Sequence, residues 1–319
     1  MNNLRADRYQ KSEFIHTMTP CDGYREYEFI PDYAGFIDPI EENNRSYVRL
    51  FEPEDGRVKG DLILIHGIGE GNIPYIQWFA SEFARRGIRT WFQLLPYHYK
   101  QKKEWMNGGQ PFLSADPDYC VKRFHMGIRD TRKILDYAED QPGYDPKDVF
   151  IFGLSFGGMI AAMAMGIDKR IRKGTLVITG GNWRWINFYS SYAEAVRQDL
   201  RENGNPYGCL NEADCVRRFR GNPVEWIREN IHSVDDIFDK SPIPCYYYDP
   251  LAYAPLIDQP VLFVKAAFDQ IMPKNATEEL AQLLKNKTER TIPTGHKSSI
   301  VLRKQIIRWA MALYDNRLR

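Results

Sequence analysis

Three residues that could together cleave a carbonyl compound occur in this chain in the order Ser, Asp, His. Ser155 stands in Gly153-Leu154-Ser155-Phe156-Gly157, directly after a run of large apolar residues. Asp269 follows a second apolar run, and His296 lies further along in Thr294-Gly295-His296-Lys297. A serine hydroxyl is a weak nucleophile that needs a base, and the base needs an acid to orient it. The three residues predict acyl transfer, with Ser155 as nucleophile, His296 as base and Asp269 as acid.

The residues around Ser155 fit a tight turn from a strand into a helix. Such a turn leaves no room for bulk two positions before and after the serine, where Gly153 and Gly157 stand. The following helix favours negative charge at its N-terminus. The N–H of Phe156 is the expected donor to a tetrahedral oxyanion.

A second glycine-rich loop follows the apolar run at residues 62–65. It reads His66-Gly67-Ile68-Gly69-Glu70-Gly71, and the N–H of Ile68 is the candidate for the second oxyanion donor. A phosphate-binding loop is the alternative, but the segment lacks the Gly-Lys-Ser/Thr ending of a P-loop and the full G-x-G-x-x-G pattern. We expect His66 to hold this loop in shape by hydrogen bonds rather than to transfer protons.

Asp269 and His296 each have a simpler interpretation. Asp269 could cap a helix that begins near residue 275, and His296 could be an ordinary histidine of a surface loop. However, the carboxyl ends of parallel strands meet at one edge of a sheet, where ligands bind. Three suitable residue types at three strand ends favour the catalytic interpretation.

The elements that must position these residues alternate along the chain. Strands are predicted at residues 47–51, 62–65, 90–94, 149–152, 175–178, 261–264 and 290–292. Helices are predicted at residues 75–86, 119–139, 156–167, 276–285 and 298–314. This alternation predicts an α/β fold with a doubly wound, mainly parallel sheet. We expect residues 1–45 to form an antiparallel lead-in, and residues 46–182 and 251–319 to form the core.

Residues 183–250 interrupt the alternation and are rich in aromatic side chains. We expect a helical cap inserted into the core, with helices at residues 191–202 and 224–231. Trp183, Trp185 and Tyr189 are candidates for substrate binding because they follow a strand directly. His98, which also follows a strand, is a further candidate for a substrate contact. For most of these aromatic residues, filling the core is an equally good interpretation.

The amino-acid composition argues against some classes of function. The 319 residues are 43% hydrophobic, and 43 Lys and Arg nearly balance 42 Asp and Glu, so nothing indicates a nucleic-acid partner. No apolar run reaches the roughly 18 residues of a membrane span. Five scattered cysteines indicate free thiols in a reducing compartment, so we expect a cytoplasmic protein. No metal or other cofactor is expected, and the oligomeric state is not predicted.

With His66-Gly67, Gly153-x-Ser155-Phe156-Gly157-Gly158, Asp269 and Gly295-His296 in place, the chain resembles the α/β-hydrolase superfamily. The resemblance spans roughly residues 45–316. It is nearest the branch of dienelactone hydrolases, acetyl esterases and prolyl-oligopeptidase-like enzymes. It implies an eight-stranded sheet and the α/β-hydrolase fold, and it gives Ser155, Asp269, His296, Ile68 and Phe156 the roles assigned above.

Some features depart from particular members of that superfamily. The loop reads His-Gly-Ile-Gly rather than His-Gly-Gly-Gly, the nucleophile is neither Cys nor Asp, and the chain has no room for a propeller domain. The expected activity is hydrolysis of a small-molecule carboxylic ester. Amide, peptide, thioester or lactone hydrolysis, acyl transfer to an alcohol, and a non-catalytic binding protein with this fold remain as alternatives.

Overall fold

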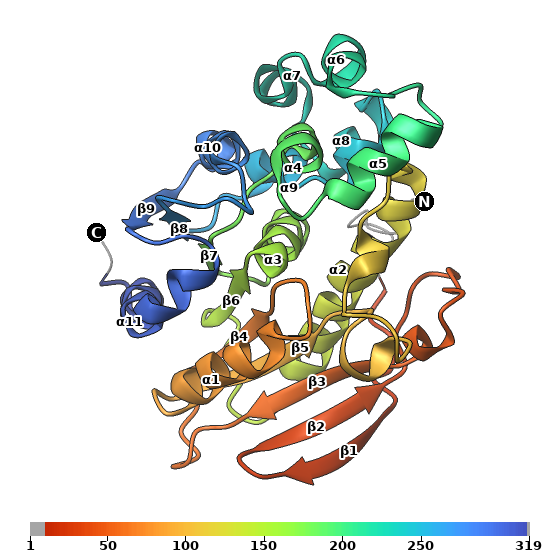
Figure 1. Cartoon of the computed structure of the whole chain (residues 1–319). Coiled ribbons are helices and arrows are strands. Elements are labelled where there is room, and N and C mark those ends of the chain that lie inside the picture. The colour runs from red at the N-terminus through yellow and green to blue at the C-terminus, as the bar shows by residue number, and fades with distance from the viewer. Residues whose placement is uncertain (1–9, 318–319) are drawn as a thin grey trace.

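The computed structural model describes residues 10–317, and within them nine strands form one sheet (Figure 1). The strand order is β1-β2-β3-β5-β4-β6-β7-β8-β9. The strands from β5 to β9 in this order pair in parallel: β5 (Ile88–Leu94), β4 (Gly60–Ile65), β6 (Val149–Leu154), β7 (Lys173–Val177), β8 (Val261–Ala266) and β9 (Lys287–Ile292). The expectation of a mainly parallel α/β sheet is confirmed.

The predicted number of eight strands is wrong, because an N-terminal hairpin extends the sheet. The hairpin consists of β1 (His16–Cys21) and β2 (Tyr24–Phe29), and β2 pairs antiparallel with β3 (Ser46–Phe51), which joins β5. Nearly every residue of β1 is exposed. An edge strand of this kind lacks the continuous apolar run that marks the central strands. Residues 1–9 of the expected lead-in lie outside the described residues.

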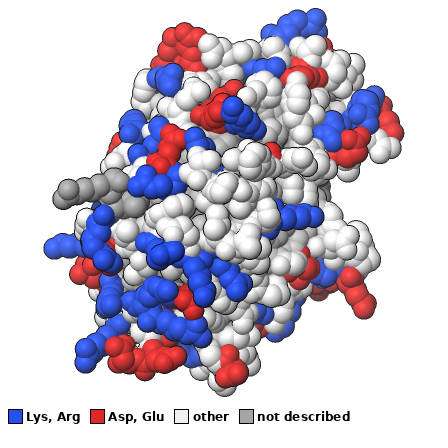
Figure 2. Space-filling view, turned by 60° about the vertical axis from the view of Figure 1, so that its left-hand side comes forward, with Lys and Arg blue, Asp and Glu red and all other residues white. Residues whose placement is uncertain are grey.

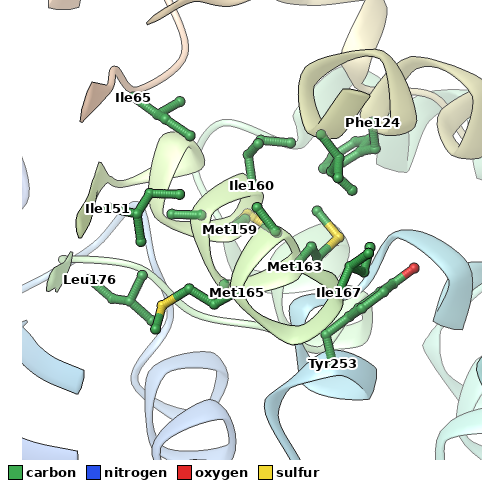
Figure 3. Packing of buried hydrophobic residues seen from close by; sticks show 14 of the residues in the cluster. Ile65, Phe124, Ile151, Met159, Ile160, Met163, Met165, Ile167, Leu176 and Tyr253 are labelled. Atoms are coloured by element: carbon green, nitrogen blue, oxygen red, sulfur yellow. The ribbon is translucent and has the colours of Figure 1, made fainter. Parts of the chain in front are cut away.

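Helices cover both faces of the sheet. Helices α1 (Asn72–Ala84) and α11 (Arg303–Tyr314) pack on one face, and α2 (Pro117–Glu139), α3 (Phe156–Ile167) and α10 (Lys274–Leu283) pack on the other. Every residue of α3 is buried, which explains a sequence that is apolar on all sides. Figure 3 shows Met159 and Ile160 of this helix beside Ile151 of β6 and Phe124 of α2. The core therefore fixes the start of α3, where Ser155 lies.

A series of short helices lies between β7 and β8, at the top of Figure 1. They are α4 (Trp183–Tyr189), α5 (Glu194–Asn203), α6 (Glu212–Cys215), α7 (Pro223–Asn230), α8 (Val234–Lys240) and α9 (Pro250–Tyr253). A π-helical turn, η5 (Val216–Arg220), continues α6. Single 3₁₀ segments complete the structure: η2 (Glu41–Asn44), η3 (Tyr99–Gln101), η4 (Gln110–Phe112), η6 (Pro244–Tyr248), η7 (Ala254–Leu256) and η8 (Lys297–Leu302).

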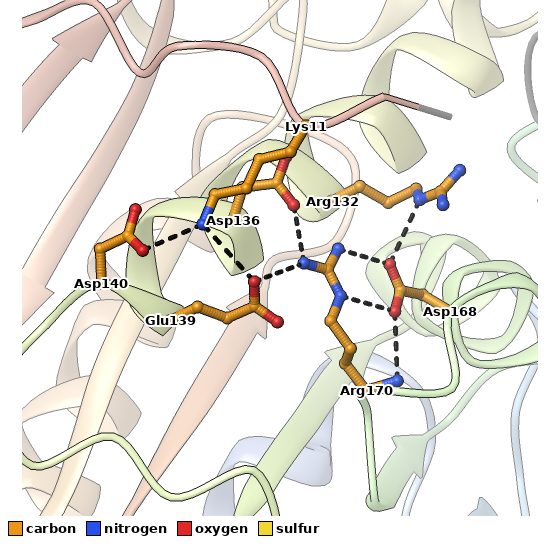
Figure 4. Close-up of polar contacts among 7 residues, drawn as sticks. All are labelled: Lys11, Arg132, Asp136, Glu139, Asp140, Asp168 and Arg170. Atoms are coloured by element: carbon orange, nitrogen blue, oxygen red, sulfur yellow. Dashed lines mark hydrogen bonds and ion pairs between the residues drawn. The ribbon is translucent and has the colours of Figure 1, made fainter. Parts of the chain in front are cut away.

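An ion-pair network fastens the far end of α2 to the turn between α3 and β7 (Figure 4). Arg170 contacts Asp136 of α2 at 2.6 Å and Asp168 at 2.7 Å, and Arg132 of α2 reaches Asp168 at 3.2 Å. Burial alone would raise the pKa of Asp168, but the hydrogen bonds from Arg170 bring that pKa below its ordinary value. The network holds the C-terminal end of α3 relative to α2.

The surface carries both signs of charge. Figure 2 turns the left-hand side of Figure 1 forward and shows Lys and Arg mixed with Asp and Glu over the upper part of this face, whereas Lys and Arg predominate at its lower left. All five cysteines, which lie within the described residues, have free thiols, as the sequence led us to expect. Within residues 10–317, no helix combines the length and the apolar character that crossing a membrane requires.

Candidate active site

Ser155 occupies a strained turn between β6 and α3. Its backbone has φ 53° and ψ −119°, a conformation that non-glycine residues rarely adopt. A Cβ atom at Gly153 would lie 2.4 Å from the carbonyl oxygen of Gly157, and one at Gly157 would lie 2.4 Å from the carbonyl oxygen of Ile65. The Ser155 N–H donates to the carbonyl of Val177 at 2.8 Å. Both glycines are thus required by close backbone contacts that hold the strained serine.

The side chains of Ser155, His296 and Asp269 form a continuous chain of hydrogen bonds. Ser155 Oγ lies 2.8 Å from His296 Nε2, and His296 Nδ1 lies 2.7 Å from Asp269 Oδ2. These residues come from the ends of three different strands, and the imidazole is mostly buried. In this arrangement, Asp269 accepts from Nδ1–H, which leaves Nε2 free to accept the serine proton.

Asp269 does not cap a helix. Its Oδ1 accepts from the backbone N–H groups of Ile271 and Met272, at 2.9 and 2.8 Å, while α10 begins only after Pro273. One carboxylate oxygen therefore fixes the turn and the other orients His296. The two loops that carry Asp269 and His296 are joined, because the Phe268 N–H donates to the Thr294 carbonyl at 3.0 Å.

Two backbone N–H groups beside Ser155 are available for an oxyanion. Phe156 is the first residue of α3, so its N–H has no acceptor within the helix. Ile68 lines the same cavity as Ser155, and a Cβ on its neighbour Gly67 would lie 3.3 Å from the Ser155 Cβ. Neither N–H donates to another group among the described residues. The predicted pair of donors thus lies next to the nucleophile.

Two buried histidines hold the loop that contains Ile68. His66 Nε2 accepts from the Leu95 N–H at 3.0 Å, and His98 Nε2 accepts from the Gly69 N–H at 2.9 Å. Burial lowers the pKa of His98 to about 4 and the pKa of His66 well below its ordinary value, so both rings are neutral acceptors. A third hydrogen bond also holds this loop, because the Asn107 carbonyl accepts from the Glu70 N–H at 3.2 Å.

His98 therefore does not occupy the position that the sequence suggested. It is fully buried beneath the Ile68 loop and lines neither cavity at Ser155, so the structure separates it from any substrate. His66 has the structural hydrogen bonds expected of it.

The three aromatic candidates of α4 are placed differently from one another. Trp183 is buried and lines a cavity at Ser155. Trp185 donates from Nε1 to Glu279 at 2.7 Å, and Tyr189 donates to Glu212 at 2.8 Å on the exposed surface. Neither Trp185 nor Tyr189 lines a cavity at Ser155. Only Trp183 is brought to the site, because successive residues of a helix face different directions.

Two cavities meet at Ser155. The large cavity has a volume of about 350 Å³ and is lined partly by Asn72, Tyr75, His296, Lys297 and Ile300. The small cavity has a volume of about 40 Å³ and is lined partly by Phe156, Met159, Trp183, Ile186 and Ala193. Ile68, Ser155, Tyr192 and Ile271 border both. The sequence did not predict that Tyr192 and Ile271 would line a cavity at Ser155. No residue spacing identifies them, because their position depends on how the segment after β7 packs over the sheet.

Comparison with solved structures shows the same fold. An esterase from an Arctic intertidal metagenomic library is 18% identical, with a TM-score of 0.57 over 97% of this chain and 100% of that chain. Acetyl xylan esterase 1 from Thermoanaerobacterium sp. is 15% identical, with a TM-score of 0.56 over 96% and 92%. The acylaminoacyl peptidase of Pyrococcus horikoshii is 15% identical, with a TM-score of 0.59 over 100% of this chain but 44% of that one.

Sequence comparison gives a curated relative over part of the chain and identifies the family. A thiohydrolase, aneE of Aspergillus aculeatus, is 27% identical over 150 residues. The match spans 47% of this chain but only 39% of that protein. Residues 62–304 match the model of the alpha/beta hydrolase family, and this stretch contains every residue of the hydrogen-bonded Ser-His-Asp chain. The chain therefore belongs to the alpha/beta hydrolase family.

Proposed function

We propose that the chain is a serine hydrolase that cleaves a small-molecule carboxylic ester through an acyl-enzyme. The observation that carries this proposal is the hydrogen-bonded chain from Ser155 Oγ through His296 to Asp269, at 2.8 and 2.7 Å. Family membership supports hydrolysis as the general reaction. The two oxyanion donors support a tetrahedral intermediate in particular.

In the first half-reaction, Ser155 Oγ attacks the ester carbonyl carbon while His296 Nε2 takes the hydroxyl proton. The carbonyl oxygen becomes an oxyanion and accepts from the N–H groups of Ile68 and Phe156. As the carbon–oxygen bond to the alcohol breaks, Nε2–H gives its proton to the leaving oxygen. Asp269 stays ionised throughout and stabilises the imidazolium.

In the second half-reaction, a water molecule attacks the acyl-Ser155 ester. His296 takes a proton from this water, a second oxyanion forms in the same place, and its collapse returns the proton to Ser155 Oγ. One water is consumed, and one acid and one alcohol are released. The chain's own residues supply every proton transfer.

A fluorophosphonate probe and para-nitrophenyl acetate test this proposal together. We expect wild-type protein to be labelled at Ser155 and to release para-nitrophenol. We expect Ser155→Ala and His296→Ala to lower kcat/KM by three or more orders of magnitude. Tyr189→Phe, which changes an exposed side chain outside both cavities, is the matched control. A folded wild type that is neither labelled nor active would overturn the proposal and favour a binding protein.

Thioester hydrolysis is the second candidate, because the curated relative is named a thiohydrolase. The same residues would serve, with a thiolate as leaving group. S-phenyl thioacetate and phenyl acetate, which differ at the leaving atom, distinguish the two. The two esters also differ in their intrinsic reactivity, which the ratio of their hydrolysis rates with hydroxide measures. If the enzyme's ratio of kcat/KM, thioester over ester, exceeds that hydroxide ratio more than tenfold, a thiohydrolase is favoured.

A further inference from the structure

The two cavities at Ser155 differ in which catalytic groups they contain. His296 lines the large cavity but not the small one, whereas Phe156 lines the small cavity but not the large one. Ser155 and Ile68 border both. A substrate with its carbonyl carbon at Ser155 Oγ must therefore extend one part into each cavity.

The proton transfers decide which part goes where. His296 Nε2 must protonate the leaving oxygen, so the alcohol part has to lie on the side of the imidazole. This side is the large cavity. The acyl chain then extends in the other direction, past Phe156, into the small cavity.

We propose that, given the serine esterase function above, the enzyme selects short acyl groups, acetyl or propionyl, on an alcohol that is several times larger. The small cavity, at about 40 Å³, has roughly a ninth of the volume of the large cavity, at about 350 Å³. The larger part of the ester therefore fits the large cavity, and the small cavity favours a short acyl group.

The chemistry of the linings supports the same division. Met159, Trp183 and Ile186 give the small cavity an apolar wall, and no charged side chain lines it. Three polar residues, Asn72, Tyr75 and Lys297, are among those that line the large cavity. Its volume of about 350 Å³ falls in the range of small-molecule sites. The alcohol part therefore carries hydrogen-bonding groups, whereas the acyl part is a short hydrocarbon.

The wall of the small cavity is held in place by buried contacts. Trp183 donates from Nε1 to the Tyr248 carbonyl at 3.3 Å, and its backbone N–H donates to Asp249 at 3.2 Å. Asp249 is fully buried and forms an ion pair with the buried Arg220 at 3.0 Å. Expanding the small cavity at Trp183 would break these bonds, so a longer acyl chain cannot enter at low cost.

The first experiment measures kcat/KM for para-nitrophenyl acetate, propionate, butyrate and hexanoate. We expect acetate or propionate to exceed hexanoate by at least tenfold. Ile186→Ala removes three carbon atoms from the small cavity, and we expect the preferred chain to lengthen to butyrate or hexanoate. Ile300→Ala makes the same change in the large cavity and should leave the chain-length profile unaltered. Ala193→Val fills the small cavity and should favour acetate further, which provides a second test if Ile186→Ala folds poorly.

The second experiment concerns the alcohol. Ethyl acetate and glycerol triacetate both release aliphatic alcohols, and we expect at least tenfold higher kcat/KM for the larger ester, measured by acid release. Equal values would overturn the inference about the alcohol.

A wild-type profile that is flat from acetate to hexanoate would overturn the inference about the acyl group while leaving the serine esterase intact. A shift in the profile with Ile300→Ala but not with Ile186→Ala would reverse the assignment of the two cavities. Failure of every ester together with failure of fluorophosphonate labelling would instead overturn the proposed function itself.

Discussion

His98 Nε2 lies 2.9 Å from the backbone nitrogen of Gly69, the residue directly after the proposed oxyanion donor Ile68. The other ring nitrogen, Nδ1, lies 3.0 Å from the Pro96 carbonyl and donates to it, which leaves Nε2 as the acceptor. His98 is thus a positioning residue that lines neither cavity. It holds the peptide between Ile68 and Gly69, which is adjacent to the peptide that carries the Ile68 N–H.

His98→Ala should lower kcat by about tenfold or more with little change in KM, because it frees the loop that must bind the oxyanion. His98→Gln, which keeps a side-chain acceptor, should recover part of kcat. Steady-state kinetics with para-nitrophenyl acetate measure both. A folded His98→Ala variant with wild-type kcat would show that the Gly69 contact has no part in catalysis.

Asp269→Asn should lower kcat by about three to four orders of magnitude while leaving the thermal midpoint nearly unchanged. The amide oxygen can still accept from Ile271 and Met272, but an amide nitrogen then faces His296 Nδ1 and favours the wrong tautomer. Asp269→Ala should lose the turn as well, so its thermal midpoint should fall. Equal thermal midpoints for Asp269→Asn and Asp269→Ala would contradict the proposal that this carboxylate both fixes the turn and orients His296.

Gly153→Ala should strongly destabilise the protein or abolish its activity. The new methyl group would lie 2.4 Å from the Gly157 carbonyl oxygen and 2.6 Å from Gly158 Cα, both of them backbone atoms that cannot rotate away. Gly71→Ala is the matched control, because a Cβ there meets nothing within 4 Å. Urea denaturation of both variants provides the measurement, and similar midpoints would show that the turn can relax.

Acid should destabilise the fold between pH 6.5 and about 4. Burial lowers the pKa of His98 and of His125 to about 4 and the pKa of His66 well below its ordinary value, so these rings bind more protons in the unfolded chain than in the folded chain in this range. Burial also raises the pKa of Asp130 to about 7, which acts in the opposite direction, but this is one group against three. As the pH falls from 6.5 to about 4, each histidine with a pKa of about 4 lowers the free energy of unfolding by up to about 3 kcal/mol. Above pH 6.5 these histidines do not change the free energy of unfolding.

The midpoint of urea unfolding as a function of pH measures this effect. His125→Gln removes one of the three buried histidines and should flatten the slope. Equal slopes for the wild type and for His125→Gln would contradict the buried, neutral state of the His125 ring.

The candidate catalytic residues could be located because each follows a predicted strand. The composition indicates burial on both faces for β6 and for most of β8, whereas β9, which precedes His296, is only partly buried. The residues of β6 are all buried, and the helix after it begins at Phe156, as the sequence indicates. The edge strand β1 could not be identified in this way, since solvent rather than the core faces most of its side chains. The local pattern of apolar residues therefore predicts a strand well only where the strand is buried along its whole length.

The substrate cavities depend on tertiary packing, and there the sequence was less informative. Trp185 and Tyr189 have the same residue chemistry as Trp183, yet Glu279 and Glu212 hold them away from Ser155. Tyr192, which borders both cavities, is separated from Trp183 by one helix and a turn. Which of these aromatic side chains reaches Ser155 depends on how the short helix α4 is rotated about its axis. No spacing of residues in the sequence specifies that rotation.

The far wall of the small cavity, at Trp183, Ile186 and Ala193, comes from the segment between β7 and β8, whereas the large cavity is built mainly by α1 and the His296 loop. The residues that line only one cavity thus come mostly from separate stretches of the chain, whereas Tyr192 and Ile271 border both cavities. Substitutions at Ile186 or Ala193, which line the small cavity alone, would change the acyl preference without altering the large cavity, so the two preferences could diverge independently in evolution.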